Sequence, residues 1–348
     1  MKSITLISLL LVFFVNITFA QDDCIIKLGD AQKYYEQGKL EQIPDLLSGC
    51  IEEGFNKENK TRALRLLTLV YLFDDDMKMA EETFLQLLSV DPEYKINQAI
   101  DPAEFIQLYN SYYTDPVFSI GAIVGINLTN PNLIETYSLN SFNDANSSYS
   151  SGGVGISLGL KMSYHLTKKI DLTLEPIYSL FTYNVSENVT TFNTTAITEK
   201  MNYMEFPVTA SYNFYKIKEY SFFVEAGLSY GLFLSGDISG KVMYNNKEQP
   251  DYEPKPVSTK ELRKKYNLAG VFGLGAQIDL SQSNLQFSVR YNVGFVNVIN
   301  TDYRYNPGNK LIPEYRFVDN DIFLNNIYFM FSYNRQFFIH KKKKSVKQ

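Results

Sequence analysis

Apolar and polar residues alternate with a period of two over most of the chain from Pro116 onward. The stretch "VFSIGAIVGINL" places every second residue from Phe118 to Leu128 on one apolar side, and "VGISLGLKMSYHL" repeats the pattern from Val154. Such alternation is typical of strands with two unlike faces. Eight stretches show it, each longer than an ordinary globular strand. We predict strands over residues 117–128, 154–166, 170–181, 203–214, 221–234, 268–280, 285–295 and 327–337.

The fourth of these stretches, "YMEFPVTASYNF", carries Glu205 and Pro207 on its polar face, opposite the face of Val208. A carboxylate there needs a partner, and proline cannot donate a ladder hydrogen bond. We therefore expect Glu205 to face an interior and to pair with Lys161 or Arg290. We also expect a bulge or local gap in the sheet at Pro207.

Between Cys24 and Tyr113 the apolar residues recur at helical spacing instead. Breaks at Gly38, Gly54 and Asp91-Pro92 predict four helices in two hairpins, over residues 24–37, 42–53, 61–73 and 77–90. A fifth helix is expected at 101–113, where Asp101 is followed by Pro102 and Glu104 in the order of a capping box.

The first twenty residues, "MKSITLISLLLVFFVNITFA", combine one lysine, an apolar run and the small Ala20. This is typical of a secretory signal peptide, and we expect cleavage after Ala20. No later run approaches the ~18 apolar residues of a spanning helix, so the remaining chain is expected to be soluble or to cross a membrane as a closed barrel.

The links between strands separate these two possibilities. Short links such as "TKK", "YKIKE" and "SQSN" alternate with long ones, among them the Asn- and Thr-rich "NVSENVTTFNTT" after the third strand. Short turns on one side and long loops on the other favour an up-and-down outer-membrane barrel over a soluble β-sandwich with a helical cap. An even number of strands places both termini of the barrel on the periplasmic side.

These patterns predict an α+β multidomain protein with an eight-stranded antiparallel up-and-down transmembrane β-barrel and an N-terminal all-α domain. Its parts are a signal peptide (1–20), a periplasmic helical domain (21–114), the outer-membrane barrel (115–338) and a basic C-terminal tail (339–348). The lysines of that tail are expected to be solvated or to contact anionic head groups.

Composition and charge argue against two classes of function, nucleic-acid binding and catalysis. The net charge is −5, and the one basic run is "HKKKK" near the C-terminus, which argues against nucleic-acid binding. An enzyme built on such a barrel needs a histidine or paired acids with a nucleophile near the outer rim. The two histidines do not fit this, since His165 falls beside the turn at Thr167 and His340 lies in the tail. We therefore expect no enzymatic activity, no cofactor and no metal.

Cys24 and Cys50 are the two cysteines of the chain, and they would lie at adjacent ends of the first helix pair. In an oxidising compartment we expect them to form a disulfide. Two buried thiols are the alternative. The C-x-x-C spacing of a redox centre is absent, so the role is structural in either case.

Five charged residues fall on the inward side of the predicted strands: Lys161, Glu175, Glu205, Glu225 and Arg290. An eight-stranded barrel is narrow enough for side chains to fill it, so charges inside it must pair. We expect a packed ionic cluster in the barrel lumen; a gated ion path is the alternative.

The strand "YMEFPVTASYNF" resembles the tyrosine, aliphatic, glutamate, aliphatic, proline strand of the PorT-like outer-membrane β-barrel family. "FVEAGLSYGLFLSG", "VFGLGAQIDL" and "VRYNVGFVNV" are similar to the next three strands of that family, in the same order. The resemblance covers about residues 116–338 and implies a membrane barrel that contacts outer-membrane lipid.

The helical part resembles tetratricopeptide (TPR) repeats. The segment "LRLLTLVYLFDDDMKMAEETFLQLLSVDP" fits the packing positions of that repeat, but Thr68 and Leu87 depart from its preference for small residues. The resemblance implies a concave groove for a peptide, with arginines that bind carboxylates. The alternative interpretation, an ordinary solvated helix face, agrees equally well with the sequence. The groove residues would be Gln32, Tyr35, Arg62, Arg65 and Leu69.

The function expected from these features is that of a barrel that anchors a protein-interaction domain. The partner would be a periplasmic or outer-membrane protein of an envelope assembly or secretion complex. One alternative is a surface barrel that adheres or binds ligand through its long loops. Another is a small-solute pore.

Overall fold

The computed structural model describes residues 17–137, 145–189, 193–245 and 248–343. The chain forms two compact units, a helical unit of residues 1–115 with 338–348, and a barrel unit of residues 116–337. Most of the predicted signal peptide lies outside the described residues, so its cleavage stays a prediction.

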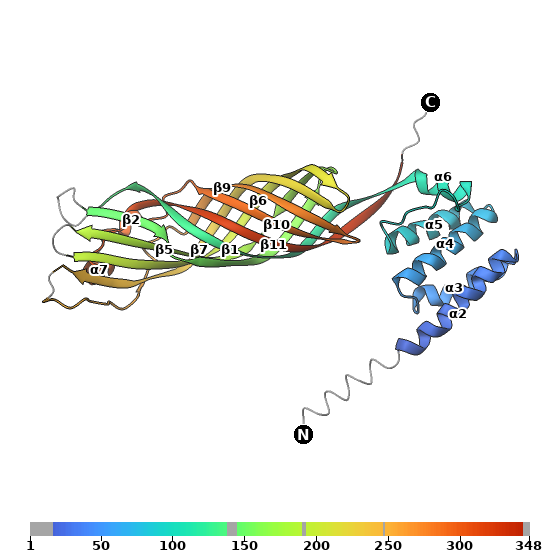
Figure 1. Ribbon diagram of the computed structural model, residues 1–348, viewed down its shortest axis with the longest axis horizontal. Helices are drawn as coiled ribbons and strands as arrows, with labels where there is room; N and C mark the ends of the chain where they lie inside the picture. Colours follow the sequence, from blue (N-terminus) through green and yellow to red (C-terminus); the bar gives the residue numbers. More distant parts are fainter. Residues whose placement is uncertain (1–16, 138–144, 190–192, 246–247, 344–348) are drawn as a thin grey trace, which may run out of the picture. The chain divides into compact units, whose positions relative to one another are not determined.

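The helical unit contains the five predicted helices. They are α2 (Ile17–Glu36), α3 (Ile43–Glu52), α4 (Lys57–Phe73), α5 (Met77–Val90) and α6 (Ala103–Ser111), with a short η1 (Leu40–Gln42) before α3 (Figure 1). Helix α4 supplies residues to two cores. Leu67 and Val70 pack with α2 and α3, whereas Leu64 and Leu69 pack with α5 and α6. No helix among the described residues is long and apolar enough to cross a membrane.

Three helices begin two or more residues away from the predicted start. Helix α2 begins at Ile17 and not at Cys24, so it includes the end of the predicted signal peptide. Helix α4 begins at Lys57 because the side chain of Asn56 accepts a hydrogen bond from the Asn59 N–H at 2.9 Å. Helix α6 has Pro102 as its N-cap without a side-chain cap, so the predicted capping box at Asp101 is wrong. The carboxylate of Asp101 instead binds Arg65 and accepts from the Asn97 N–H at 2.7 Å.

The barrel unit is a closed ring of eight strand positions, as predicted. Their order is β1 (Tyr112–Glu135), β3 (Val154–His165), the interrupted pair β4 (Ile170–Leu174) and β5 (Ile177–Val189), β6 (Asn193–Ile217), β7 (Tyr220–Tyr244), β9 (Tyr266–Leu280), β10 (Ser283–Gly294) and β11 (Asp321–Lys342). The β6–β7 pairing closes the ring. Two short strands, β2 (Ala145–Ser151) and β8 (Val257–Ser258), pair with β5 and β7. The last long link holds η2 (Thr301–Tyr303) and α7 (Leu311–Tyr315).

The expected gap at Pro207 is present on one side of β6. There the neighbouring strand is broken into β4 and β5 at Glu175-Pro176, and the Glu175 N–H donates to the Pro207 carbonyl at 3.0 Å. On the other side Pro207 pairs with Ser229 without a register shift. Pro176 and Pro207 thus lie at the same interruption, so the hydrogen bonds along the rest of the ladder are kept.

The prediction of a long loop at "NVSENVTTFNTT" is wrong. Strands β5 and β6 pair continuously from Ile177 opposite Glu205 to Val189 opposite Asn193, so the link after the third strand is short. Inward residues such as Val185 and Ile197 remain buried along this extension, whereas the polar residues alternate with them. Threonine also suits strands. The strict alternation of short and long links therefore fails at this position.

The strands change polarity along their length. On β6, outward residues are apolar from Met204 to Phe214, the ~9–11 residues that a tilted membrane strand needs. From Asn202 toward Asn193 the outward residues become polar, and the inward side gains buried apolar residues, Met201 and Ile197, which alternate with Glu199 and Thr195. A register shift between Asn202 and Tyr203 marks the boundary. We call the apolar stretch the membrane half and the remainder, which carries β2, β8 and α7, the loop end.

Candidate functional site

Four of the five predicted lumen residues form one buried ionic cluster in the membrane half. Arg290 of β10 binds Glu175 with both terminal nitrogens, and its Nε donates to Glu225 Oε1 at 2.6 Å. Lys161 of β3 lies 3.2 Å from Glu175 Oε1. Two cations thus balance two carboxylates, which is the arrangement that a buried charge requires. Gly273 makes room for it, because a Cβ there would lie 2.6 Å from Glu225 Oε1.

Glu205, the fifth lumen residue, is buried as predicted but has a different partner. Its carboxylate accepts a hydrogen bond from the Tyr328 hydroxyl at 2.8 Å. The expected ion pair with Lys161 or Arg290 is therefore wrong, because Glu175 and Glu225 already occupy both cations. A phenol on β11 could not be distinguished by sequence from the other tyrosines of the barrel.

Side chains fill the membrane half around this cluster. His165 Nδ1 lies 2.6 Å from Asp171 Oδ1, beside a cavity of about 10 Å³ that Lys161 also lines. A second cavity of about 10 Å³ lies between Glu205, Arg290 and Tyr328. Each volume corresponds to about one water molecule. These two cavities of the lumen therefore have room for single waters.

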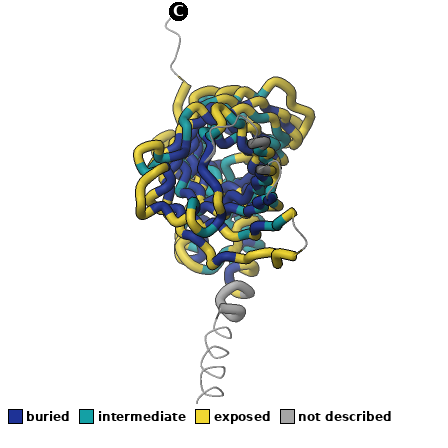
Figure 2. Tube along the Cα trace, turned by 90° about the vertical axis from the view of Figure 1, so that its left-hand side faces the viewer, coloured by how far each residue is buried: buried dark blue, intermediate teal, exposed yellow. Residues whose placement is uncertain are grey.

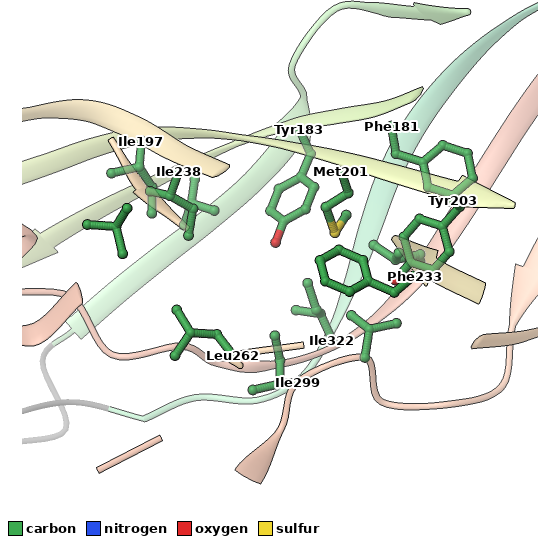
Figure 3. Packing of buried hydrophobic residues seen from close by; sticks show 14 of the residues in the cluster. Phe181, Tyr183, Ile197, Met201, Tyr203, Phe233, Ile238, Leu262, Ile299 and Ile322 are labelled. Carbon is green, nitrogen blue, oxygen red and sulfur yellow. The ribbon is translucent and has the colours of Figure 1, made fainter. Parts of the chain in front are cut away.

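A hydrophobic core occupies the loop end of the barrel. Figure 3 shows strand residues such as Tyr183, Met201 and Phe233 packed with Leu262 and Ile299 from the links. Leu311, Tyr315 and Phe317, from α7 and the residues after it, join the same core. Viewed onto this end, buried residues lie inside and exposed ones outside (Figure 2). The long links thus fold into the barrel mouth.

A second buried ionic cluster lies within this core, and the sequence did not predict it. The Arg263 guanidinium binds Glu199 and donates to both Asp319 oxygens at 2.9 and 3.1 Å. The Tyr183 hydroxyl donates to the same Glu199 carboxylate. Burial opposes the charge of Arg263, but Asp319 and Glu199 outweigh it and raise the pKa of the guanidinium. The sequence feature that could have indicated this cluster was Glu199, because it lies on the same inward face of β6 as Glu205.

The predicted groove residues of the helical unit are not equally available. Leu69 is buried in the core with α5 and α6, and Arg65 is bound to Asp101. Gln32 and Tyr35 are partly buried, and Arg62 is exposed. Leu69 is therefore too buried to line an open groove, and the guanidinium of Arg65 is already paired with the Asp101 carboxylate.

A more exposed apolar surface lies at the turn between α4 and α5. Phe73 is 76% exposed and Met77 is 49% exposed, and the exposed acids Asp74, Asp75 and Asp76 lie between them. We call Phe73–Met77 the helical tip. Exposed large apolar side chains beside polar ones are typical of protein contact sites.

Cys24 and Cys50 form the predicted disulfide, which joins α2 to α3 with the Cα atoms 5.6 Å apart. Gly54 packs against it, because a Cβ there would lie 2.6 Å from Cys24 Sγ. Gly54 also has a φ of +149°, which side chains rarely adopt. The disulfide therefore fixes both helices and the turn that follows them.

The first residues of the predicted C-terminal tail belong to β11 and contact the helical unit. Lys342 forms an ion pair with Glu81 of α5 and lies over the Tyr112 ring. The Lys343 N–H donates to the Ser111 carbonyl at 2.7 Å. The hydrogen bond from Lys342 lowers the pKa of Glu81. These lysines are therefore not a free tail; residues 344–348 lie outside the described part.

Within the described ranges no cluster of His, Cys, Asp or Glu has the composition of a metal site.

Comparison with known proteins agrees with this architecture. Residues 112–300, more than half of the chain, match the family described as outer membrane protein beta-barrel domain. No curated protein matches the sequence.

Similar solved structures include neisserial surface protein A (13% identity, TM-score 0.32, covering 63% of this chain and 97% of that one). They also include the attachment invasion locus protein Ail of Yersinia pestis (11%, 0.29, 64% and 100%). A third is OprG of Pseudomonas aeruginosa (13%, 0.35, 64% and 97%). The family match shows that the chain belongs to the outer-membrane β-barrel domain family and is a protein of the outer membrane.

Proposed function

We propose that this barrel is a non-enzymatic anchor for its helical unit, which binds a protein partner in the periplasm. The complex would be an envelope assembly or secretion machine, with this chain as an accessory or scaffold subunit. The observation that carries the proposal is the filled barrel: an ionic cluster occupies the membrane half, and a hydrophobic core occupies the loop end.

A small-solute pore accounts for these features less well. Conduction needs a continuous polar path, but a hydrophobic core occupies the loop end, and the charged residues within it, Arg263, Glu199 and Asp319, are buried and bound to one another. The described cavities of the membrane half have room for about one water each.

Strand count and link lengths support the proposed periplasmic placement. Eight strands return the chain to the side on which it started, so the start of β1 and the end of β11 share one side. Barrels of this class have short turns on the periplasmic side and longer links outside. The links β3–β4, β6–β7 and β9–β10 are short, which favours a periplasmic helical unit.

The helical unit has features of a binding domain. Its two helical hairpins resemble TPR repeats, which hold peptides and partner tails, and a disulfide braces the first hairpin. Gln32, Tyr35 and Arg62 remain candidates for the groove. The helical tip adds an apolar contact with an acidic border, which suits a partner surface with an apolar recess and basic residues around it.

A deletion of residues 21–110 tests the proposal. The signal peptide and the whole barrel remain, so we expect a folded barrel with heat-modifiable gel mobility that no longer recovers the partner. The measurement is co-purification from detergent-solubilised outer membranes, compared with the full chain by mass spectrometry. Equal recovery of the same proteins with the deleted chain would contradict the anchor role.

A further inference from the structure

A pocket of about 620 Å³ lies on the strand extensions at the loop end. Asn184 of β5, Thr198 of β6 and Ser239 of β7 line it, with Ser150 of β2 at one side. Asn184 and Thr198 alternate with the buried Val185 and Ile197, yet they are only partly exposed themselves. They therefore lie on a concave surface, in contrast to the convex outer face of an ordinary barrel.

One wall of the pocket is Glu253-Pro254, and its position is fixed by neighbouring contacts. Val242 of β7 and Tyr252 exchange two backbone hydrogen bonds of 2.8 and 2.9 Å. The Tyr252 hydroxyl also donates to Glu314 of α7 at 2.9 Å. These contacts hold one wall of the pocket in place, which reduces the entropic cost of binding a ligand.

The lining offers neutral hydrogen-bonding groups. The Thr198 hydroxyl donates to Asn184 Oδ1 at 2.7 Å, which leaves the amide nitrogen of Asn184 as a donor for a ligand. The hydroxyls of Ser150, Ser186 and Ser239 can donate or accept. The charged lining residues, Lys241 and Glu253, have opposite signs.

We propose that this pocket binds a neutral oligosaccharide. Sugar hydroxyls match a lining of hydroxyls and one amide because each can donate and accept. An apolar ligand would leave these groups unpaired, and the opposite charges of Lys241 and Glu253 favour neither an anion nor a cation. The volume falls within the ~300–1,000 Å³ of small-ligand pockets. This site is on the barrel unit, so it is independent of the function proposed for the helical unit.

The test uses the purified full chain in lauryldimethylamine oxide, a detergent without a sugar head group that would compete. An array of neutral, sialylated and sulfated oligosaccharides gives the selectivity, and titration calorimetry gives the Kd of the best neutral binder. We expect Asn184→Ala, which removes a donor, and Ser186→Trp, which fills the pocket, each to weaken binding at least tenfold.

The matched control is Asn188→Ala. Asn188 Oδ1 accepts from the Thr194 hydroxyl at 2.8 Å on the same two strands, but neither residue lines the pocket. Heat-modifiable mobility establishes that each variant is folded. The proposal is overturned if no neutral oligosaccharide binds, if binding is confined to charged ones, or if Asn188→Ala loses as much affinity as Asn184→Ala.

Discussion

Arg290 illustrates, at the scale of a residue, how this barrel accommodates charge. Its inward position and that of its partners could be predicted from alternation along each strand. The partner of each charged group could not be predicted in this way, because it depends on which inward residues lie at the same height along the barrel axis. Glu205 meets Tyr328 of β11, and Glu175 takes both cations, which only the register of eight strands determines. The Arg263 cluster was missed because two of its members, Arg263 and Asp319, lie in links between strands.

Replacing Arg290 with methionine should destabilise the barrel strongly. The change leaves Glu175 and Glu225 buried with one remaining cation, and breaking a buried ion pair from one side costs about 3–5 kcal/mol. The measurement is urea unfolding in lipid vesicles, followed by the loss of heat-modifiable mobility.

Arg335→Met is the matched control, since Arg335 is exposed and donates to Gln282 at the surface. We expect it to change the unfolding free energy by about 0.5 kcal/mol or less. An Arg290→Met protein as stable as this control would show that the lumen cluster does not hold the barrel.

At the scale of elements, periodicity predicted the helices and the membrane half of each strand. It did not predict that β5 and β6 continue through "NVSENVTTFNTT", because Asn and Thr on one face of a strand look like loop composition when the buried face is not considered. The buried Val185 and Ile197 were the overlooked signal. Tertiary contacts with the links complete these extensions.

Removing the disulfide should loosen the helical unit alone. Cys24 and Cys50 are 26 residues apart, and closing a loop of this length stabilises by about 3.5 kcal/mol in the chain-entropy relation. We expect Cys24→Ser with Cys50→Ser to increase amide hydrogen exchange in α2 and α3. Exchange in the barrel strands should be unchanged, and an equal increase there would contradict the division into two units.

Within the helical unit, the contact between Lys342 at the end of β11 and Glu81 of α5 should depend on pH. Lys342 lowers the pKa of Glu81, so the stabilisation is present above the ordinary carboxyl pKa of about 4.3 and is lost as the pH falls through the lowered value. We predict that Lys342→Met raises the pKa of Glu81 in an NMR titration of glutamate-labelled protein. Lys341→Met, at the preceding position, should leave that pKa unchanged; a shift of equal size would count against the Lys342 contact.

At the scale of the whole molecule, the barrel unit has two kinds of interior. The membrane half has apolar residues outside and polar residues inside, whereas the loop end has the reverse and resembles a soluble domain. This inversion explains why the average composition is ordinary although lipid contacts part of the surface. It also explains why the long links are folded, since their apolar residues pack against the inward side of the strands at the loop end.

This arrangement predicts that the barrel does not conduct. The purified full chain in planar lipid bilayers should give no stepwise current, because inward apolar residues close the loop end and the ionic cluster fills the membrane half. Reproducible single-channel steps that scale with protein concentration would show instead that the interior opens.

The central claim, that the helical unit binds a partner while the barrel anchors it, is tested most directly by photo-crosslinking in intact cells. A photoreactive amino acid replaces Phe73 at the helical tip, and in a second variant it replaces Ile100, which is 72% exposed compared with 76% for Phe73. We expect a discrete crosslinked envelope protein from Phe73 and much less of it from Ile100. An absence of any protein crosslink at Phe73, or the same products from both positions, would contradict it.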